Sequence, residues 1–363
     1  MKSETGIRAA EVVLPCTELE ETIAFFVERL GFRVAAIFPA DDPSTAVVSG
    51  HGLRVRLQRD WSGPPGVLRL LCDDPGAIAG GIGKLIAPNG TRIELADWDA
   101  PLVLPLLRPS FVLTRLGEGA HWKLGRAAMQ YRDLIPDRQG GRFIASHIRI
   151  AEQGPVPDYV HYHEVRFQMI YCYKGWARVV YEDQGPPFTL SAGDCVLQPP
   201  TIRHRVLESS AGLEVIEISS PAHHATLADH ALELPTSRVR PDRDFGGQRF
   251  VRHEAAAASW LRWRHPGFEA RDLGIAAATG GGATAHVVRR HGAASAEPSR
   301  HEAELQFRFV LAGAATLECD GHGAHRLGPG DAFVVPPGVL HKLAEASDEL
   351  EFLEVAVADA ERP

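Results

Sequence analysis

The sequence predicts a mainly β protein in which two copies of one barrel module follow a small α+β domain. Three observations support this prediction. Short β-branched runs alternate with turns along most of the chain. The 35 glycines and 26 prolines are spread as turn residues and do not gather in a low-complexity tract. From about residue 121 onward the sequence pattern repeats at a fixed displacement, which indicates a duplicated structural unit.

The composition is typical of a soluble globular protein, with 45% hydrophobic and 23% charged residues. A chain of 363 residues has room for two or three domains. The formal charge of −8, with both signs interspersed, argues against a nucleic-acid-binding protein, which needs a basic face. No apolar run is long enough to span a membrane, and the first ten residues lack a signal-peptide core. The five cysteines are scattered and odd in number. We therefore expect a cytoplasmic protein without nucleic-acid or membrane partners.

Residues 1–97 predict a domain with the element order βαβββ. A strand over 7–16 precedes a helix over 18–30, whose apolar residues share one face and which ends at Gly31. Three strands follow in "FRVAAIF", "TAVVSG" and "LRVRLQ", and a shorter second unit runs from "GVLRLLC" to "TRIELAD". Residues 98–120 are apolar and broken by prolines, which predicts a connector packed against a neighbouring domain.

The rest of the chain contains two segments with the same spaced residues. The stretch 154–175 recurs at 292–313 with every matching residue displaced by 138 positions, and "GDCVLQPPTIRH" recurs as "GDAFVVPPGVLH" with a displacement of 137. A displacement kept over so many unlike residues predicts two copies of one module. We assign the copies to residues 121–240 and 241–363.

The first module contains a cluster of potential metal ligands. His161 and His163 are two residues apart, so in a strand their side chains point to the same face. Gln168 is the first of the residues in the next strand whose side chains point into the barrel. His204 follows a Pro-Pro turn that directs it back across the sheet. Three imidazoles and one side-chain oxygen suit a divalent transition ion with open coordination positions. The sequence therefore predicts a metal site in this module.

The spacing H-x-H-x4-Q-x6-G, followed by G-D-x4-P-x4-H, resembles the paired motifs of the cupin superfamily. The resemblance covers about residues 121–359 and implies two tandem barrels of the double-stranded β-helix, or jelly-roll, type. It also implies that the metal ligands of the first barrel are His161, His163, Gln168 and His204, with glutamine where glutamate is the usual ligand. Iron, nickel, zinc, cobalt and manganese all suit such a ligand set.

An amide in place of a carboxylate affects the chemistry expected of this metal. Three imidazoles and one amide cancel none of the charge of a dication, so the ion attracts anionic ligands and polarises a bound oxygen strongly. We therefore expect Lewis-acid chemistry of the isomerase or lyase type on a small, anionic, oxygenated metabolite. Dioxygenation is the second branch, since three-histidine iron sites also occur among cupins.

The second module differs at the corresponding positions, which are occupied by Ser299, His301, Gln306 and His341. A serine hydroxyl is a poor neutral ligand for a transition ion. We therefore expect this module to bind metal weakly or not at all, and to keep its barrel for packing and for binding a small ligand.

The segments "VLPCTELEETIAFFVERLGFRV" and "APNGTRIELAD" resemble the vicinal oxygen chelate family, which includes the glyoxalases and the bleomycin-resistance proteins. The resemblance covers about residues 6–97. Glu94 falls at the position of that family's late glutamate ligand, but the early strand has no histidine and the second half is short. This unit is accordingly expected to be an interaction or dimerisation module, and the whole chain a homodimer.

Three classes of function remain open on the sequence alone. The first is a metal-dependent enzyme that works in the first barrel, with no residue yet assigned a catalytic role. The second is a non-catalytic protein that binds or senses a small molecule. The third is a structural protein of the seed-storage type, against which the open metal site argues.

Overall fold

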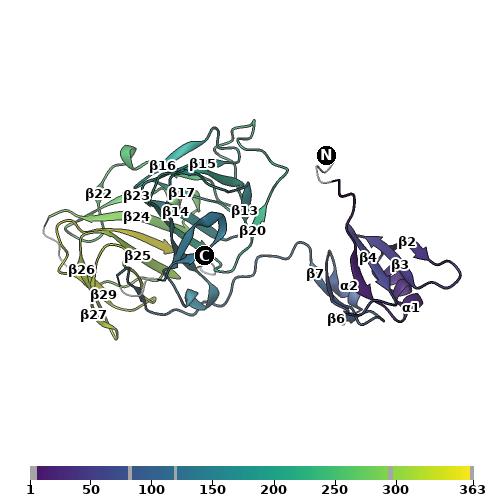
Figure 1. Cartoon of the computed structure of the whole chain (residues 1–363). Helices are drawn as coiled ribbons and strands as arrows, with labels where there is room; N and C mark the ends of the chain where they lie inside the picture. Colours follow the sequence, from purple (N-terminus) through teal and green to yellow (C-terminus); the bar gives the residue numbers. More distant parts are fainter. Residues whose placement is uncertain (1–5, 81–83, 118–120, 293–296, 360–363) are drawn as a thin grey trace. The chain divides into compact units, whose positions relative to one another are not determined.

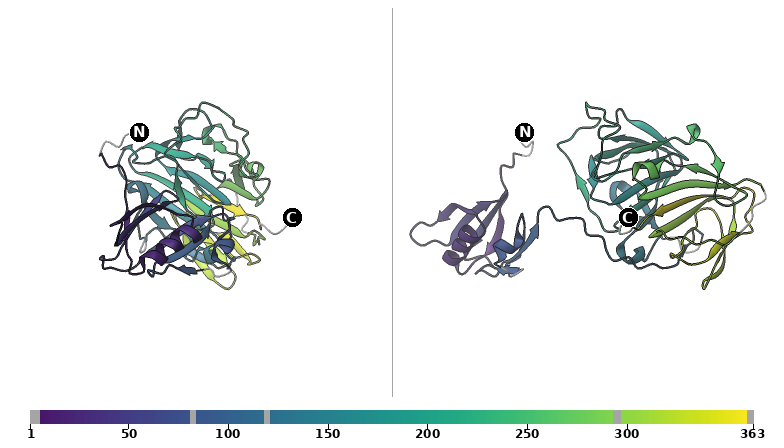
Figure 2. Two further views of the ribbon diagram at one scale, coloured as in Figure 1. Left: turned by 90° about the vertical axis from the view of Figure 1, so that its right-hand side faces the viewer. Right: turned by 180° about the vertical axis from the view of Figure 1, so that it is seen from behind.

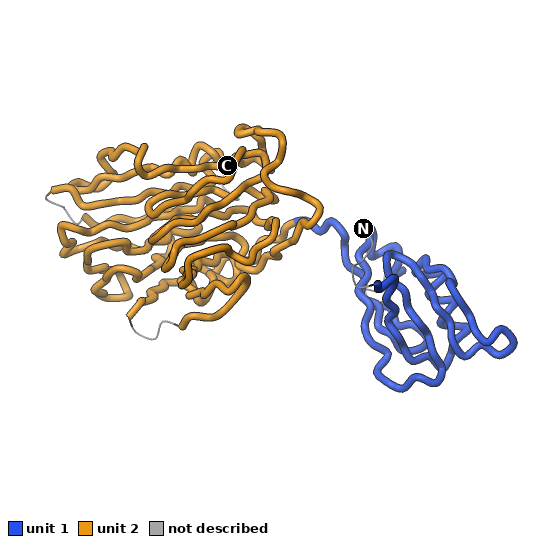
Figure 3. Tube along the Cα trace, turned by 45° about the horizontal axis from the view of Figure 1, so that its top comes forward, with its two compact units in different colours: residues 1–101 blue, residues 102–363 orange. Residues whose placement is uncertain are grey.

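The computed structural model describes residues 6–80, 84–117, 121–292 and 297–359. The chain divides into two compact units, unit 1 (Met1–Pro101) and unit 2 (Leu102–Pro363) (Figure 3). None of the described helices has the length and apolar character that crossing a membrane would require.

Unit 1 begins with the predicted βαβββ order. The sheet has the strand order β1-β4-β3-β2, with β1 parallel to β4 and the other neighbours antiparallel. Leu19 and Phe26 of the helical segment are buried in the core of this unit. Gly31 ends the helical segment with a φ of +72°, which suits glycine. The elements are β1 (Val12–Pro15), α1 (Leu19–Ala24), the π-helical turn η1 (Phe25–Arg29), β2 (Arg33–Phe38), β3 (Thr45–Gly50) and β4 (Leu53–Gln58).

The second half of unit 1 is shorter than the first, as expected from the sequence, but it contains a third strand, β6, in addition to the two that the sequence indicated. Its sheet has the order β5-β7-β6, with β5 parallel to β7. The carboxylate of Asp74 accepts a hydrogen bond from the backbone N–H of Ala77 (2.9 Å) and so caps the short helix. The elements are β5 (Val67–Cys72), α2 (Pro75–Ala79), β6 (Lys84–Ile86) and β7 (Arg92–Asp97).

The first barrel of unit 2 consists of two sheets (Figures 1 and 2). One has the order β21-β17-β14-β19-β11-β10-β9, and the other has the order β16-β15-β18-β13-β20 with β12 paired to β18. The elements are β9 (Lys123–Leu124), η2 (Arg126–Ala128), β10 (Gln130–Asp133), η3 (Arg138–Gly141), β11 (Ile144–Ile150), β12 (Gly154–Pro155), β13 (His161–His163), β14 (Phe167–Lys174), β15 (Trp176–Tyr181), β16 (Phe188–Ser191), β17 (Cys195–Leu197), β18 (His204–Ser209), β19 (Leu213–Ser220), β20 (Thr226–Ala228) and β21 (Val251–His253).

The second barrel repeats this plan with a smaller second sheet. Its large sheet has the order β22-β23-β24-β30-β25-β28-β8, and its small sheet has the order β27-β26-β29. The elements are β8 (Val112–Thr114), η4 (Ala255–Ala257), β22 (Leu261–Arg262), β23 (Phe268–Asp272), α3 (Ile275–Ala278), β24 (Ala283–Arg290), β25 (Leu305–Ala312), β26 (Ala315–Cys319), β27 (Gly323–Leu327), β28 (Ala332–Val334), β29 (His341–Ala344) and β30 (Glu351–Val357).

The two barrels exchange one strand each. β8, which precedes the first repeat, pairs with β28 of the second barrel. β21 lies inside residues 241–363, the range predicted from the sequence for the second module. It nevertheless pairs with β17 of the first barrel. The segment 98–120 is therefore more than the connector predicted from sequence, because part of it is a strand of the second barrel. Each added strand covers backbone groups at a sheet edge that would otherwise be unpaired.

The barrels also share one hydrophobic core. Phe167 and Met169 of the first barrel and Phe307 and Phe309 of the second belong to the same cluster of buried side chains. Across the junction, the buried carboxylate of Glu304 pairs with Arg142 (2.6 Å) and Arg166 (2.7 Å). These contacts explain why both barrels form a single compact unit.

Candidate metal centre

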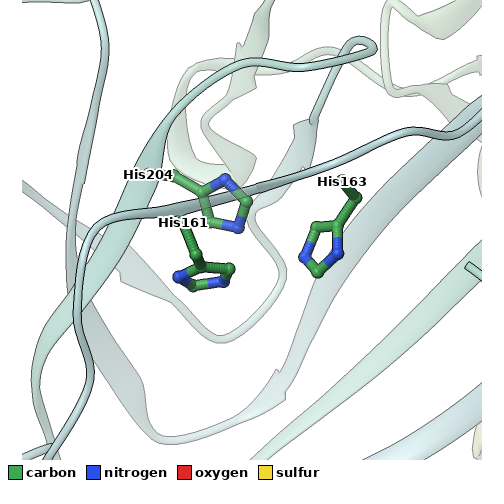
Figure 4. Close-up of side chains that lie close together, drawn as sticks. All are labelled: His161, His163 and His204. Carbon is green, nitrogen blue, oxygen red and sulfur yellow. The ribbon is translucent and has the colours of Figure 1, made fainter. Parts of the chain in front are cut away.

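Three histidines meet inside the first barrel. His161 and His163 lie on the same face of β13, because side chains two residues apart in a strand point the same way. His204 is the first residue of β18 and stands directly opposite His161 in the antiparallel register. The three are buried, and one ring nitrogen from each lies within 4.8 Å of the others (Figure 4). The ligand type and spacing are those of a transition-metal site.

Backbone carbonyls fix the orientation of all three rings. Nδ1 of His161 lies 2.8 Å from the carbonyl oxygen of Tyr159. Nδ1 of His163 lies 3.2 Å from that of Ala225, and Nδ1 of His204 lies 3.0 Å from that of Ile202. A carbonyl can only accept, so each Nδ1 carries the proton and each Nε2 keeps its lone pair. Such contacts orient the imidazole ligands of metal sites and set their tautomer. The donor set therefore fits a divalent transition ion.

The environment also keeps the rings uncharged. Burial lowers the pKa of all three histidines, and Arg126 lowers each of them further; neighbouring histidines also lower the pKa of His163 and His204, whereas Asp158 raises that of His161. The pKa of His163 falls to about 3, and that of His204 lies well below its ordinary value. Because only a neutral imidazole binds a metal ion, the site is ready for metal at neutral pH without a change of protonation.

We expect the metal-free protein to become less stable as the pH falls from 6.5 towards about 3. An unfolded histidine takes up a proton below its ordinary pKa of 6.5, whereas folded His163 stays neutral down to about 3. The unfolded state then binds more protons, so the free energy of unfolding decreases as the pH is lowered through this window. Denaturant titrations at several pH values measure this slope. A His163→Gln variant, which cannot titrate there, should show a shallower slope, and an unchanged slope would contradict the assignment.

Gln168 lines the same cavity but also contacts a carboxylate that sequence reasoning missed. The buried amide of Gln168, on β14, donates through Nε2 to Oε1 of Glu217 at 3.2 Å. The hydroxyl of Ser219 donates to the same oxygen at 3.3 Å. Glu217 lies on β19 and lines the cavity together with the histidines. The sequence contained one indication of Glu217. The displacement of 137 positions aligns it with Glu354, so both modules have a glutamate at this position.

Arg126 is the second cavity residue that the sequence analysis did not identify. It comes from the turn η2, and its Nη2 lies 3.0 Å from Nε2 of His161, while Nη1 contacts the buried carboxylate of Asp158. The Asp158 carboxylate is fixed in turn by the backbone N–H groups of Tyr159 and Val206, both at 2.9 Å. Because Nε2 of His161 has one lone pair, binding of metal there requires Arg126 to give up this contact. Its guanidinium would then be a cation beside the metal.

The cavity around these polar groups is mainly apolar. It has about 720 Å³ of free space between the two sheets of the barrel, and this figure includes volume that is open to solvent. Aliphatic side chains make up much of the wall, and Glu217 is the one carboxylate among the described residues that line it. A space of this size and character suits a small organic molecule that offers a few polar atoms at one place.

The second barrel places its corresponding residues differently. The rings of His301 and His341 are 6.2 Å apart, and Nε2 of His301 contacts the carbonyl oxygen of Val335 at 2.8 Å. Ser299 is held by backbone hydrogen bonds to His341 in both directions, at 2.9 and 3.1 Å. Gln306 is buried on β25. In the described part of the chain, the first barrel supplies the one group of three or more histidine, cysteine or acidic residues arranged for a metal.

The polar interior of the second barrel contains an ion-pair cluster. The buried carboxylate of Glu354 accepts hydrogen bonds from Nε of Arg308 (2.7 Å) and from Nη2 of Arg264 (2.7 and 2.8 Å). Burial alone would raise the pKa of Glu354, but the two arginines more than offset this effect and lower it to about 2. This carboxylate is therefore ionised at neutral pH.

Glu94 of unit 1 does not take part in a metal cluster among the described residues. It lies on β7, where its carboxylate pairs with Arg92 at 3.1 Å and its side chain is 40% exposed. An exposed ion pair of this kind contributes little to stability.

Comparisons with known proteins agree with the architecture of unit 2. The family model for the cupin domain matches residues 147–219 and 285–356. A variant of Bacillus subtilis oxalate decarboxylase OxdC is similar in structure, with a TM-score of 0.52 at 15% identity over 73% of this chain and 80% of that one. Ylba from E. coli is similar with a TM-score of 0.52 at 12% identity, over 71% of this chain and 96% of that one.

A further structure of the Bacillus subtilis decarboxylase, described for its Mn(II) centres, superimposes with a TM-score of 0.51 at 15% identity, over 73% of this chain and 80% of that one. Curated protein sequences include no significant match to this chain. At these identities the likeness is one of fold. The chain contains two cupin domains in tandem, and the buried triad of the first one has the ligands for a metal ion.

Proposed function

We propose that the first barrel is the active site of a metal-dependent enzyme that acts on a small carboxylate or carbonyl compound by isomerase or lyase chemistry. The observation that carries this proposal is the convergence of three neutral, oriented imidazoles in a cavity that also holds a carboxylate. His161, His163 and His204 would hold a divalent transition ion, with Gln168 as a fourth ligand or as a donor beside it. When bound, the ion would polarise an oxygen of the substrate.

Glu217 would move the proton in such a reaction. Its Oε1 is held by Gln168 and Ser219, and none of the described residues hydrogen bonds to its Oε2. Oε2 is thus available to take a proton from a substrate carbon or hydroxyl and to return it elsewhere. Isomerases and lyases need this step, and a carboxylate in a mainly apolar cavity can perform it.

Arg126 would bind the acid group of the substrate. Its guanidinium is held by Asp158 at the cavity wall, and a planar guanidinium pairs well with a carboxylate. In the absence of an anion it contacts His161. An anionic substrate would therefore draw Arg126 away from the histidine at the time when the metal needs that nitrogen.

A Glu217→Gln variant should keep its metal and lose about 100-fold in kcat, a typical contribution of general acid–base catalysis. The amide has the same shape and can still accept from Gln168 and Ser219, but it cannot take up a proton. Metal content per chain, measured beside kcat, separates this role from metal binding. Loss of metal in the variant would show that Glu217 serves the ligand set instead.

The reaction class is tested with metal-loaded protein and a panel of 2-oxo, 2-hydroxy and dicarboxylic acids. Oxalate belongs in the panel because an oxalate decarboxylase shares the two-barrel fold. Turnover in the absence of oxygen supports the proposed chemistry, whereas oxygen consumption with bound iron supports the dioxygenase branch. Retained metal without turnover on any acid would favour the alternative of a binding or sensing protein.

For unit 1 we propose a vicinal-oxygen-chelate-like module through which the chain forms a homodimer. In support of this, β2 is an edge strand on which Val34, Ile37 and Phe38 are 42 to 46% exposed. Exposed apolar side chains on a sheet edge favour pairing with a second copy. Light scattering on the full chain should give the mass of a dimer, and Ile37→Lys should give a monomer. A monomeric wild type would refute the proposal.

A further inference from the structure

The second barrel has an internal cavity of its own, separate from the metal centre. It has about 350 Å³ of free space, part of it open to solvent, and the side chains of Trp263, Phe268 and Phe352 form apolar parts of its wall. Two buried polar side chains, Arg308 and His341, also line it, and they are 3% and 2% exposed. Buried polar atoms normally have hydrogen-bond partners, so those that lack them identify where a ligand can bind.

Arg308 has free donors at this cavity. Its Nε donates to Oε2 of Glu354, but neither terminal NH2 group has a hydrogen-bond partner among the described residues. The two repeats differ here in an informative way. Ile170 faces Glu217 in the register of β14 and β19, and Arg308 faces Glu354 in the same register of β25 and β30. The second barrel thus has a guanidinium where the first barrel has an aliphatic side chain.

The charges around the cavity leave a positive excess. Arg308 and Arg264 share the single carboxylate of Glu354, so this cluster carries one net positive charge. Lys342, which also lines the cavity, is paired with Glu318 at 2.9 Å, and the carboxylate of Glu297 is exposed, where solvent and salt screen its charge. Although the Arg264 side chain is 45% exposed, the excess positive charge favours a monoanion over a cation as the ligand. The fork of a guanidinium selects a carboxylate in particular.

His341 has a buried ring nitrogen that can accept a hydrogen bond from a ligand in the cavity. Its Nδ1 lies 3.1 Å from the carbonyl oxygen of Val339, so Nδ1 carries the proton. Its Nε2 then has a lone pair, and this buried nitrogen has no partner among the described residues. A ligand that fills the cavity would need an O–H or N–H group to satisfy it.

From these contacts we infer that the second barrel is a metal-free binding site for a small hydroxycarboxylate. The carboxylate would bind the terminal NH2 groups of Arg308, and the hydroxyl would donate to Nε2 of His341. The carbon skeleton would lie against Trp263, Phe268 and Phe352. A single net positive charge favours a monoanion over an uncharged zwitterion such as an amino acid. The site lies outside the metal centre and does not depend on the activity proposed there.

The test is calorimetric titration of the full-length chain with lactate, propionate and alanine. The His163→Ala background removes metal from the first barrel, so that metal-bound lactate does not contribute. We expect one lactate per chain, with propionate, which lacks the hydroxyl, and alanine, which is a zwitterion, both weaker by about 10-fold or more. Arg308→Met should weaken lactate binding by about 10- to 100-fold, because it removes a charged hydrogen-bond pair.

Two further variants make the result specific. Arg126→Met removes the guanidinium that we propose binds an acid group in the first barrel, so lactate binding that persists in this variant takes place in the second barrel. His341→Leu should bring lactate down to the affinity of propionate, a change that general loss of packing would not produce; it also serves if Arg308→Met fails to fold. The inference is overturned if lactate binds equally well to Arg308→Met, if Arg126→Met abolishes binding instead, or if alanine binds as tightly as lactate.

Discussion

Replacing His163 with alanine is expected to remove the bound metal and to abolish turnover. Wild-type protein prepared without added metal should carry about one equivalent per chain, and the variant should carry less than about 0.1. The reason lies in the geometry of the triad. His163 supplies one of three converging nitrogens, and the remaining pair, His161 and His204, would leave the ion with too few protein ligands. Elemental analysis of both proteins measures this directly.

Two control variants define the location of the metal. His223→Ala removes an exposed histidine near the barrel in sequence and should leave the metal content unchanged. His301→Ala removes a histidine of the second barrel and should also leave it unchanged. If His163→Ala retains its metal, the ligand set is wrong. If neither wild type nor variant holds metal even after reloading, the chain is better regarded as a binding module.

Replacing Glu354 with glutamine is expected to lower the free energy of unfolding by about 3–5 kcal/mol, the usual cost of removing one partner from a buried ion pair. Glu354 is 2% exposed and is the carboxylate shared by Arg308 and Arg264. Without it, Arg308 would be a buried cation with no counterion. Denaturant unfolding at neutral pH measures the effect, provided that the slope of the transition is the same in both proteins.

The repeat supplies a matched control for this substitution. Glu217 occupies the corresponding place in the first barrel, but its described hydrogen-bond donors, Gln168 and Ser219, are uncharged. Glu217→Gln should therefore cost only about 1 kcal/mol, the scale of an ordinary hydrogen bond. Equal destabilisation by the two substitutions would mean that the ion-pair cluster contributes nothing beyond the packing of a side chain of this size.

The different surroundings of these two glutamates are part of a wider difference between the interiors of the two barrels. The first copy has His161 and Ile170, where the second has Ser299 and Arg308. Losing a histidine removes a metal ligand, and gaining an arginine places a fixed positive charge in the barrel. The second copy thus combines the loss of a ligand with a guanidinium paired to its buried carboxylate, whereas the carboxylate of Glu217 in the first copy has uncharged hydrogen-bond donors.

Much of the fold could be predicted from the sequence, because its signals are local or periodic. Side chains alternate along a strand, so the two-residue spacing of His161 and His163 is enough to place them on one face. The constant displacement between the repeats is likewise enough to indicate two modules. The βαβββ order of unit 1 followed from the spacing of its apolar residues and turns, although its relationship to a known family remains a proposal.

Other features depended on which segments meet in three dimensions. The exchange of β8 and β21 between the barrels could not be foreseen, because a three-residue strand carries no signal of the sheet edge to which it pairs. Arg126 and Glu217 were missed for a related reason. They are 35 and 56 positions from His161 in the sequence, and only the closure of the barrel brings them into one cavity.

The sequence by itself determined the strand pattern, the duplication and the three histidines that bind metal in our proposal. The tertiary structure decided how those histidines are held, with each Nδ1 on a backbone carbonyl, and which charges surround them. It also showed that Arg308 of the second barrel, at the position of Ile170 in the first, pairs with a buried carboxylate. The physical reason is that alternation and repetition are properties of neighbouring residues, whereas tautomer, burial and charge balance depend on groups that folding brings together from distant parts of the chain.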